Sequence, residues 1–333
     1  MKPRRTRGSL AQKTAFATLA AVLLAGCGEV KNTISPPADT ANQLTVVLAG
    51  RPNAFYAGIY DAQALGLFKQ TDLDVHIVTP STAQDPITMV HDNQVIVAIS
   101  SEPNVLLHRN EDQPVVAVAA IVHAPLQTIN IAVPKGAPSG GAGVGTGTTT
   151  TATTTTATRT KAARTRTTTT NTSTQTARST STTATPTTTT LADPGASLWP
   201  AALQQLLSKP GYPTYNGLVV VVRKNTIVNH APLLRRFVQA VARGYRAARS
   251  NPKQAITNLI TAVPSLAPQQ PLETAILHAA LPYIFPAGLK VWGYQRQGAW
   301  NAFGHWLTQN NLLDNPNAII DAVTNELLPG QGV

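Results

Sequence analysis

One long stretch of this chain cannot be buried in a hydrophobic core, and it separates two parts that can. Residues 146–190 contain 27 threonines among 45 positions, with no large apolar side chain. A segment with so little apolar surface cannot offset the entropy that folding removes. The composition therefore predicts that this tract is disordered or irregular, and that a core is built from the residues on either side of it.

Before the tract, short apolar strands alternate with helical stretches. Strands are predicted at 44–48, 74–78, 95–99 and 115–122, with helices at 57–67, 85–91 and 103–109. This alternation indicates an α/β fold with a parallel sheet that is covered on both faces. Ligands of such sheets bind beyond the carboxyl ends of the strands. Here those ends are followed by residues 49–56, 79–82, 100–104 and 123–127.

After the tract, the pattern predicts one more strand and several helices. The strand spans 218–223, and Pro232 opens a helix with one apolar face that runs to Arg249. Asn251 and Pro252 form a cap and first turn typical of a helix start. Further helices are expected at 272–281, at 297–309 and after Asn315-Pro316.

The first 27 residues have the layout of an exported bacterial lipoprotein. A basic start is followed by an apolar run from Ala15 to Leu24 and by Leu-Ala-Gly before Cys27. The apolar run is shorter than the roughly 20 residues that a membrane span needs. We therefore expect cleavage after residue 26, acylation of Cys27, and a lipid-anchored protein outside the cytoplasmic membrane. Residues 27–43 are polar and predict a tether.

The formal net charge of +11 does not indicate a nucleic-acid partner. Five basic residues lie in the leader and five in the threonine tract, neither of which contains an acid, so the rest of the chain carries +1. Cys27 is the only cysteine, and the seven histidines show no metal-ligand spacing. No metal site, cofactor or catalytic group is therefore predicted.

Three groups of short stretches, taken together, resemble a known family. They are RPNAFYAGIY at 51–60 with GLFK at 66–69 and LDV at 73–75; AISSEP at 98–103 with PVVAVAAIV at 114–122 and PL at 125–126; and WGY at 292–294 with Trp300, Trp306 and TNELLP at 324–329. In this order they are similar to solute-binding lipoproteins of ABC importers, in the branch shared with thiamine pyrimidine synthase and alkanesulfonate-binding proteins. The similarity covers about residues 44–135 and 210–330.

The resemblance implies a periplasmic-binding-protein type 2 clamp, in which two lobes enclose a small-molecule ligand. Closure of such a clamp presents the ligand to the importer's permease and ATPase subunits. Many members of this branch are taken to bind an aminopyrimidine precursor of thiamine or a related heterocycle. For this chain the resemblance therefore implies transport of such a compound, with the lipid on Cys27 holding the protein at the membrane.

The chain departs from the family where the second lobe should be. Residues 44–135 and 211–330 correspond to lobe one, whereas residues 136–210 contain the threonine tract in place of lobe two. One account is a genuine low-complexity segment. The other is a frameshifted stretch of GC-rich coding sequence, which reading the DNA in the other two frames would decide. Either way, a clamp with one wall is expected to bind its ligand weakly.

Six residues are candidate ligand contacts, all at or near the predicted strand ends. Glu102 can accept hydrogen bonds from an aminopyrimidine edge, or it can simply be an acid that the helix dipole favours. Tyr56 stands where relatives usually have His, and its ring can stack on a flat heterocycle or pack in the core. Asn53 and Ser101 can bind ligand or cap local structure. The remaining candidates are Tyr60, which core packing also explains, and His123.

Two other functions stay open from the sequence. The first is an enzyme like thiamine pyrimidine synthase, which in that family uses an active-site histidine, pyridoxal phosphate, iron and a cysteine-rich motif. The lipoprotein leader, the single cysteine and Tyr56 argue against it. The second is a surface lipoprotein whose threonine-rich tract is a glycosylated stalk, which requires that tract to be genuine.

Overall fold

The computed structural model describes residues 42–81, 84–133, 188–193 and 195–330. All of them belong to one compact unit, residues 36–333. The predicted signal peptide, Cys27, nearly all of the tether and the threonine tract up to residue 187 lie outside the described residues. Among the described helices, none is both long and apolar enough to cross a membrane.

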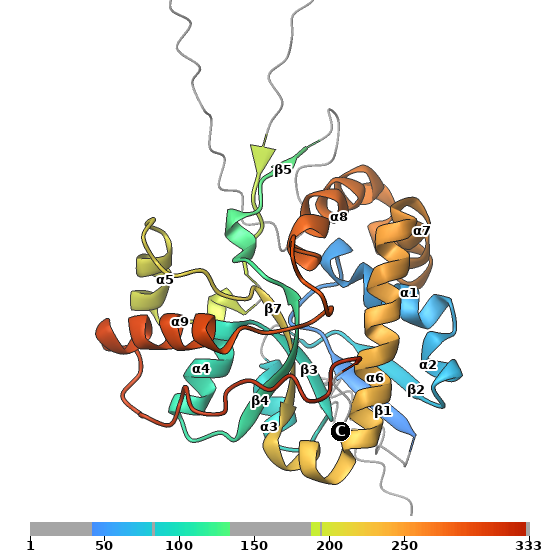
Figure 1. Ribbon diagram of the computed structural model, residues 1–333. Coiled ribbons are helices and arrows are strands. Elements are labelled where there is room, and N and C mark those ends of the chain that lie inside the picture. The colour runs from blue at the N-terminus through green and yellow to red at the C-terminus, as the bar shows by residue number, and fades with distance from the viewer. Residues whose placement is uncertain (1–41, 82–83, 134–187, 194, 331–333) are drawn as a thin grey trace, which may run out of the picture. The chain divides into compact units, whose positions relative to one another are not determined.

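A five-stranded sheet forms the centre of the fold (Figure 1). Its strand order is β2 (Asp74–Val78), β1 (Gln43–Val47), β3 (Val97–Ser100), β7 (Leu218–Arg223) and β4 (Val115–Val122). Strand β1 is parallel to β2 and β3, but β7 runs antiparallel to β3 and β4. The predicted parallel sheet is therefore corrected to a mixed one. The alternation of strands and helices in the sequence predicts the apolar strands. It does not predict that β7 lies between β3 and β4 and runs antiparallel to both.

The strand register brings several chain segments to one end of the sheet. Ser100 at the end of β3 pairs with Val219, and Val122 at the end of β4 pairs with Leu218 at the start of β7. The carboxyl ends of β1, β3 and β4 and the amino end of β7 therefore lie at the same end, called here the carboxyl end of the sheet. The predicted ligand residues follow these strands.

Helices cover both faces of the sheet, as the sequence pattern predicts (Figure 1). Val220 and Val222 of β7 face one core cluster, whereas Val219 and Val221 face the other. The first cluster is completed by α1 (Ala57–Ala64), α2 (Leu67–Gln70), α6 (Lys224–Ser250), α7 (Pro252–Ala262) and α8 (Gln270–Ile284). The second is completed by α3 (Pro86–His91), α4 (Glu102–Asn110), α5 (Ala201–Leu207) and α9 (Gln297–Gln309).

Most predicted helices form, with differences at their ends. The helix predicted at 57–67 is divided in two, because Gly66 adopts a left-handed conformation with φ of 66°. Helix α6 begins at Lys224, earlier than predicted, and is kinked at His230, two residues before Pro232. The helix predicted after Asn315-Pro316 is wrong, since the structure describes no helix between residues 310 and 330.

That final segment is held by side chains instead of helical hydrogen bonds. Arg109 Nε donates to the Ala318 carbonyl at 2.8 Å, and another Arg109 nitrogen donates to the Asn317 carbonyl at 3.1 Å. The Asn315 side chain accepts from the Asn317 backbone at 2.9 Å. Asn315 therefore caps a turn, and the carbonyl groups that a helix would need are engaged by Arg109.

The described part of the stretch 136–210 is ordered and packs on the core. Strand β6 (Thr188–Thr189) pairs antiparallel with β5 (Ile131–Ala132), which follows the short 3-10 helix η2 (Leu126–Thr128). After β6 come η3 (Ala196–Leu198) and α5. The apolar side chains that are buried here are Leu191, Trp199, Leu203 and Leu207. This part of the chain therefore contributes to the core, although the sequence analysis grouped residues 136–210 with the threonine tract.

Two further short helices, η1 (Ala54–Tyr56) and η4 (Pro264–Gln269), complete the described elements.

Candidate functional site

A buried carboxyl group lies at the carboxyl end of the sheet. Glu102 is the first residue of α4, directly after β3, and its side chain is 0% exposed. Its Oε2 accepts hydrogen bonds from the Asn216 backbone at 2.8 Å and from Asn216 Nδ2 at 2.7 Å. The Glu102 backbone N–H in turn donates to the Asn216 carbonyl at 3.0 Å. Since Asn216 precedes β7, these three bonds join the end of β3 to the start of β7.

One oxygen of this carboxyl group has no partner among the described residues. Glu102 Oε1 is buried and makes no hydrogen bond there, and the same is true of the neighbouring Ser101 Oγ. Burial raises the pKa of Glu102 to about 8, against the opposing effect of the two Asn216 donors. At pH 7 the carboxyl group is therefore mostly protonated. Buried polar atoms without partners are uncommon in folded proteins, so this pair is a candidate ligand contact.

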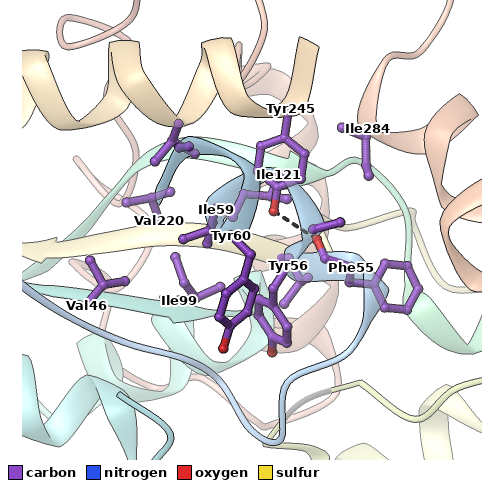
Figure 2. Packing of buried hydrophobic residues seen from close by; sticks show 14 of the residues in the cluster. Val46, Phe55, Tyr56, Ile59, Tyr60, Ile99, Ile121, Val220, Tyr245 and Ile284 are labelled. Carbon is purple, nitrogen blue, oxygen red and sulfur yellow. Dashed lines mark hydrogen bonds between the residues drawn. The ribbon is translucent and has the colours of Figure 1, made fainter. Parts of the chain in front are cut away.

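Tyr56 and Tyr60 lie in the segment that follows β1. Their side chains are almost fully buried, and in Figure 2 their hydroxyl groups point to the same side. The Tyr56 hydroxyl makes no hydrogen bond of normal geometry within the described residues, although the backbone of Ala49 lies beside it. Burial raises the pKa of both tyrosines, that of Tyr60 to about 12, so both are neutral. The two rings thus present one buried phenol without a partner.

Asn53 has a structural role in the same segment. Its Oδ1 accepts from the Phe55 backbone at 2.9 Å and caps η1. The segment is also held from α8, because Glu273 Oε2 accepts from the Ala54 backbone at 2.6 Å. Glu273 is 2% exposed, and burial raises its pKa to about 7. No sequence pattern indicates this contact, since the two residues are 219 positions apart.

His123 follows β4 and is fixed by its backbone. Its N–H donates to the Tyr283 carbonyl at 3.0 Å, whereas its buried Nε2 has no partner among the described residues. Burial, together with the positive charge of Arg296, lowers the pKa of His123 to about 4. The imidazole is therefore neutral at physiological pH and can donate or accept one hydrogen bond.

A second buried polar network lies beside the first. Asp193 Oδ1 accepts from the Leu126 backbone at 2.8 Å, and its Oδ2 accepts from the Tyr215 hydroxyl. The Asn104 side chain donates to Ser100 Oγ at 3.2 Å and accepts from the Trp199 indole. Burial raises the pKa of Asp193 to about 7. This network was not predicted from the sequence, because Asp193 lies in the stretch 136–210 that was grouped with the threonine tract. One signal was available: Asp193 is the only acidic residue between Asp112 and Glu273.

The site is therefore a set of buried polar groups on the loops at one end of an α/β sheet. Of the eight buried side-chain atoms that lack a partner among the described residues, four lie just after β1, β3 and β4, at Tyr56, Ser101, Glu102 and His123. No group of three or more His, Cys, Asp or Glu residues that could hold a metal ion occurs in the described part of the chain. Such a set can bind a small polar molecule through hydrogen bonds.

Parts of the chain are similar to a known protein family. Residues 53–137 and 204–255 match the family described as NMT1/THI5 like. Over 111 residues the chain is 37% identical to the formylaminopyrimidine-binding protein of Halalkalibacterium halodurans. That match covers 33% of this chain and spans 33% of the relative. Over these residues the chain is similar to the NMT1/THI5-like family, which confirms the family resemblance predicted from the sequence.

Several solved structures have a similar outline at low sequence identity. The alkanesulfonate-binding protein of Xanthomonas axonopodis pv. citri is 12% identical, with a TM-score of 0.47 over 86% of this chain and 99% of that one. The aliphatic sulphonate-binding protein of Escherichia coli is 10% identical, with a TM-score of 0.47 over 85% and 92%. A ligand-binding component of an ABC-type import system from Staphylococcus aureus is 11% identical, with a TM-score of 0.47 over 87% and 99%.

Proposed function

We propose that this chain is an extracytoplasmic solute-binding lipoprotein of an ABC importer, and that its ligand is an aminopyrimidine of the thiamine-precursor type. The observation that carries the proposal is the buried Glu102 carboxyl group, whose Oε1 has no partner among the described residues. The ligand class is supported by the partial similarity to a formylaminopyrimidine-binding protein. Cys27 supplies the anchor, and the permease and ATPase of the importer are the protein partners.

The geometry of Glu102 suits the edge of an aminopyrimidine. Because Oε2 already accepts two N–H bonds from Asn216, the proton of the neutral acid is on Oε1. That O–H can donate to a ring nitrogen of the heterocycle. The exocyclic amine beside this nitrogen can then donate to Ser101 Oγ, which has no partner among the described residues. A ligand that makes both bonds satisfies two buried groups that are otherwise unpaired.

The tyrosines provide the apolar part of the proposed contact. Tyr60 lies close enough to Tyr56 to add to the effect of burial in raising the pKa of Tyr56. Their rings supply flat surface for a heterocycle, and the free Tyr56 hydroxyl supplies a further hydrogen bond. His123 is assigned a peripheral role, with Nε2 directed to a polar substituent of the ligand.

We expect weak binding, because the threonine tract occupies most of the stretch in which the family's second wall is expected. An affinity in the range of about 10 µM to 1 mM corresponds to a binding free energy of roughly −7 to −4 kcal/mol. Two hydrogen bonds, to Glu102 and Ser101, would contribute roughly 1–3 kcal/mol of this free energy, and stacking on the tyrosine rings is proposed to supply the rest. In the described residues, no feature specifically favours the enzyme alternative.

Calorimetric titration of the purified protein with a formylaminopyrimidine tests the proposal. Wild-type protein is expected to bind in the range given above. Replacement Glu102→Leu removes the proposed donor, so binding should fall at least tenfold, whereas Glu102→Gln keeps the two bonds from Asn216 and presents an N–H donor in place of the O–H, so it should bind about as well as the wild type. The matched control is Asp61→Asn, another buried carboxyl group, whose Oδ1 accepts from Asn258 at 2.7 Å. No binding by the wild type, or equal binding by Glu102→Leu, would contradict the proposal.

A further inference from the structure

We infer that Asp193 is a positioning residue for the ligand site: through Tyr215 it fixes Asn216, and through Asn216 it sets the position of the free oxygen of Glu102. The effect of Asp193 on ligand binding rests on the proposed function. The structural part of the inference concerns three consecutive links between described residues, and each can be disturbed separately.

The first link anchors Asp193 itself. Both carboxylate oxygens are used, one by the Leu126 backbone at 2.8 Å and one by the Tyr215 hydroxyl. The Asp193 carbonyl also accepts from the Ala196 backbone at 3.0 Å. The side chain is 4% exposed, so water does not compete for these bonds. Asp193 therefore joins the segment after β6 to η2 and to the segment before β7.

The second link is the pair of consecutive residues Tyr215 and Asn216. The Tyr215 ring packs on Phe303 of α9, with 4.8 Å between ring centroids, and on Trp199 at 6.4 Å. Its hydroxyl reaches Asp193, while the next residue directs its backbone N–H and its side-chain amide at Glu102. A shift of Tyr215 therefore moves both donors that hold Glu102 Oε2.

The third link ties the same segment to the base of α4. The Trp199 indole donates to Asn104, whose amide donates to Ser100 Oγ at 3.2 Å. Gly195 allows this approach, because it has a positive φ of 78° and a Cβ there would lie 2.4 Å from Asn104 Nδ2. Asp193 and Trp199 thus act on the Glu102 segment from two directions, Asp193 through Tyr215 and Asn216, and Trp199 through Asn104 and Ser100.

The direction in which the Glu102 pKa changes shows whether a variant has lost the Asn216 donors or has loosened the whole site. Burial raises the pKa of Glu102, and the two Asn216 donors lower it. Loss of the Asn216 donors from a carboxyl group that stays buried raises this pKa further, whereas water entering a loosened site lowers it. Asp193, Tyr212 and Tyr215 are the titratable groups that interact with one another beside Asn216. No charged group is among the causes of the Glu102 shift.

The test is a carbon-13 NMR titration of the Glu102 carboxyl group in the absence of ligand. Tyr215→Phe removes the hydroxyl and keeps the ring, and Asp193→Asn keeps the shape but loses one acceptor. Both variants are expected to raise the Glu102 midpoint by half a pH unit or more, while Asp61→Asn leaves it unchanged. An unchanged or lowered midpoint in Tyr215→Phe overturns the inference, and this variant retains the packing of the ring should Asp193→Asn fail to fold.

A ligand titration of the same variants separates this inference from the proposed function. If the midpoint rises in both variants and the wild type binds a formylaminopyrimidine, affinity is expected to fall about tenfold in each variant. If the midpoint rises but the wild type binds no aminopyrimidine, Asp193 still positions Glu102 and the proposed function is wrong. If the wild type binds and neither variant alters the midpoint or the affinity, the positioning inference is wrong.

Discussion

Three buried carboxyl groups give the free energy of unfolding of this chain an unusual pH dependence. Burial raises the pKa of Glu102 to about 8, and that of Asp193 and Glu273 to about 7. An acid with a raised folded-state pKa stabilises the native state below its unfolded pKa, and this contribution is lost as the pH rises through the folded value. His123 acts in the opposite direction, since its lowered pKa removes stability in acid, below about pH 6.5.

We therefore predict that the melting temperature falls between pH 6.5 and pH 8.5. The native state holds protons in this interval that the unfolded chain has released, so a rise in pH favours unfolding. Glu102→Gln removes one of these protons, and its melting temperature should depend less steeply on pH. Differential scanning calorimetry at several pH values measures the slope. A wild-type melting temperature that rises over this interval would contradict the prediction.

At the level of single residues, the sequence could indicate candidates but not their partners. Residues that follow apolar strands can be predicted from the pattern, and Tyr56, Ser101, Glu102 and His123 are found there with buried atoms that have no partner in the part of the chain that the structure describes. Their role in ligand binding stays a prediction. Asn216, Asp193 and Glu273 were missed because each acts through a partner far away in the sequence, at Glu102, Leu126 and Ala54.

At the level of elements, periodicity predicts which segments are strands and helices but not how strands pair. The predicted strand at 74–78 and helix at 297–309 match β2 and α9 at both ends. The antiparallel entry of β7 was not predictable, because an apolar run such as Leu218–Arg223 carries no information on direction. The error after Asn315 has a local cause: an Asn-Pro pair opens a turn as readily as a helix.

The crossing of α1 and α6 determines where the Tyr56 segment lies. Gly58 and Gly244 meet at this crossing, and a Cβ on Gly244 would lie 2.0 Å from the Gly58 carbonyl oxygen. The close approach lets the Tyr245 hydroxyl donate to the Phe55 carbonyl at 2.8 Å (Figure 2). Helix α6 thereby supports η1 from one side while Glu273 supports it from the other.

We predict that Gly244→Ala destabilises the protein by about 1–3 kcal/mol, the usual effect of overpacking a core. The added methyl group meets backbone, which cannot rotate away as a flexible side chain does. The matched control is Gly298→Ala in α9, where a Cβ has no neighbour within 4 Å. That change should stabilise by about 0.4–1 kcal/mol. Urea denaturation compares the two variants, and equal free energies of unfolding would show that the helices are not in close contact.

For the whole molecule, the leader and the described unit lead to complementary predictions. The unit 36–333 is an α/β fold with a polar site at the carboxyl end of its sheet. Cys27 lies outside the described residues, so lipid attachment stays a prediction from the sequence. The α/β class could be predicted because strand and helix patterns alternate. Whether a second lobe is present could not be predicted, because most of the threonine tract also lies outside the described residues.

We predict that Cys27→Ser releases the protein from membranes of a bacterial host. Each buried methylene of an acyl chain contributes about 0.8 kcal/mol to membrane binding, and the serine variant carries no acyl chain. Membrane and soluble fractions are compared by immunoblotting, with Ser9→Ala in the leader as the control. Wild type and Ser9→Ala should sediment with membranes. An equal membrane fraction for Cys27→Ser would show that acylation of Cys27 does not anchor the chain.

In the proposed function, a small aminopyrimidine binds through Oε1 of Glu102. The most direct measurement is the carbon-13 NMR titration of the Glu102 carboxyl group in wild-type protein, with and without a saturating formylaminopyrimidine. A ligand nitrogen that accepts the Oε1 proton stabilises the protonated acid, so the account predicts a Glu102 midpoint above the value of about 8 in the free protein. A ligand that binds while the Glu102 signal and midpoint stay unchanged would contradict it.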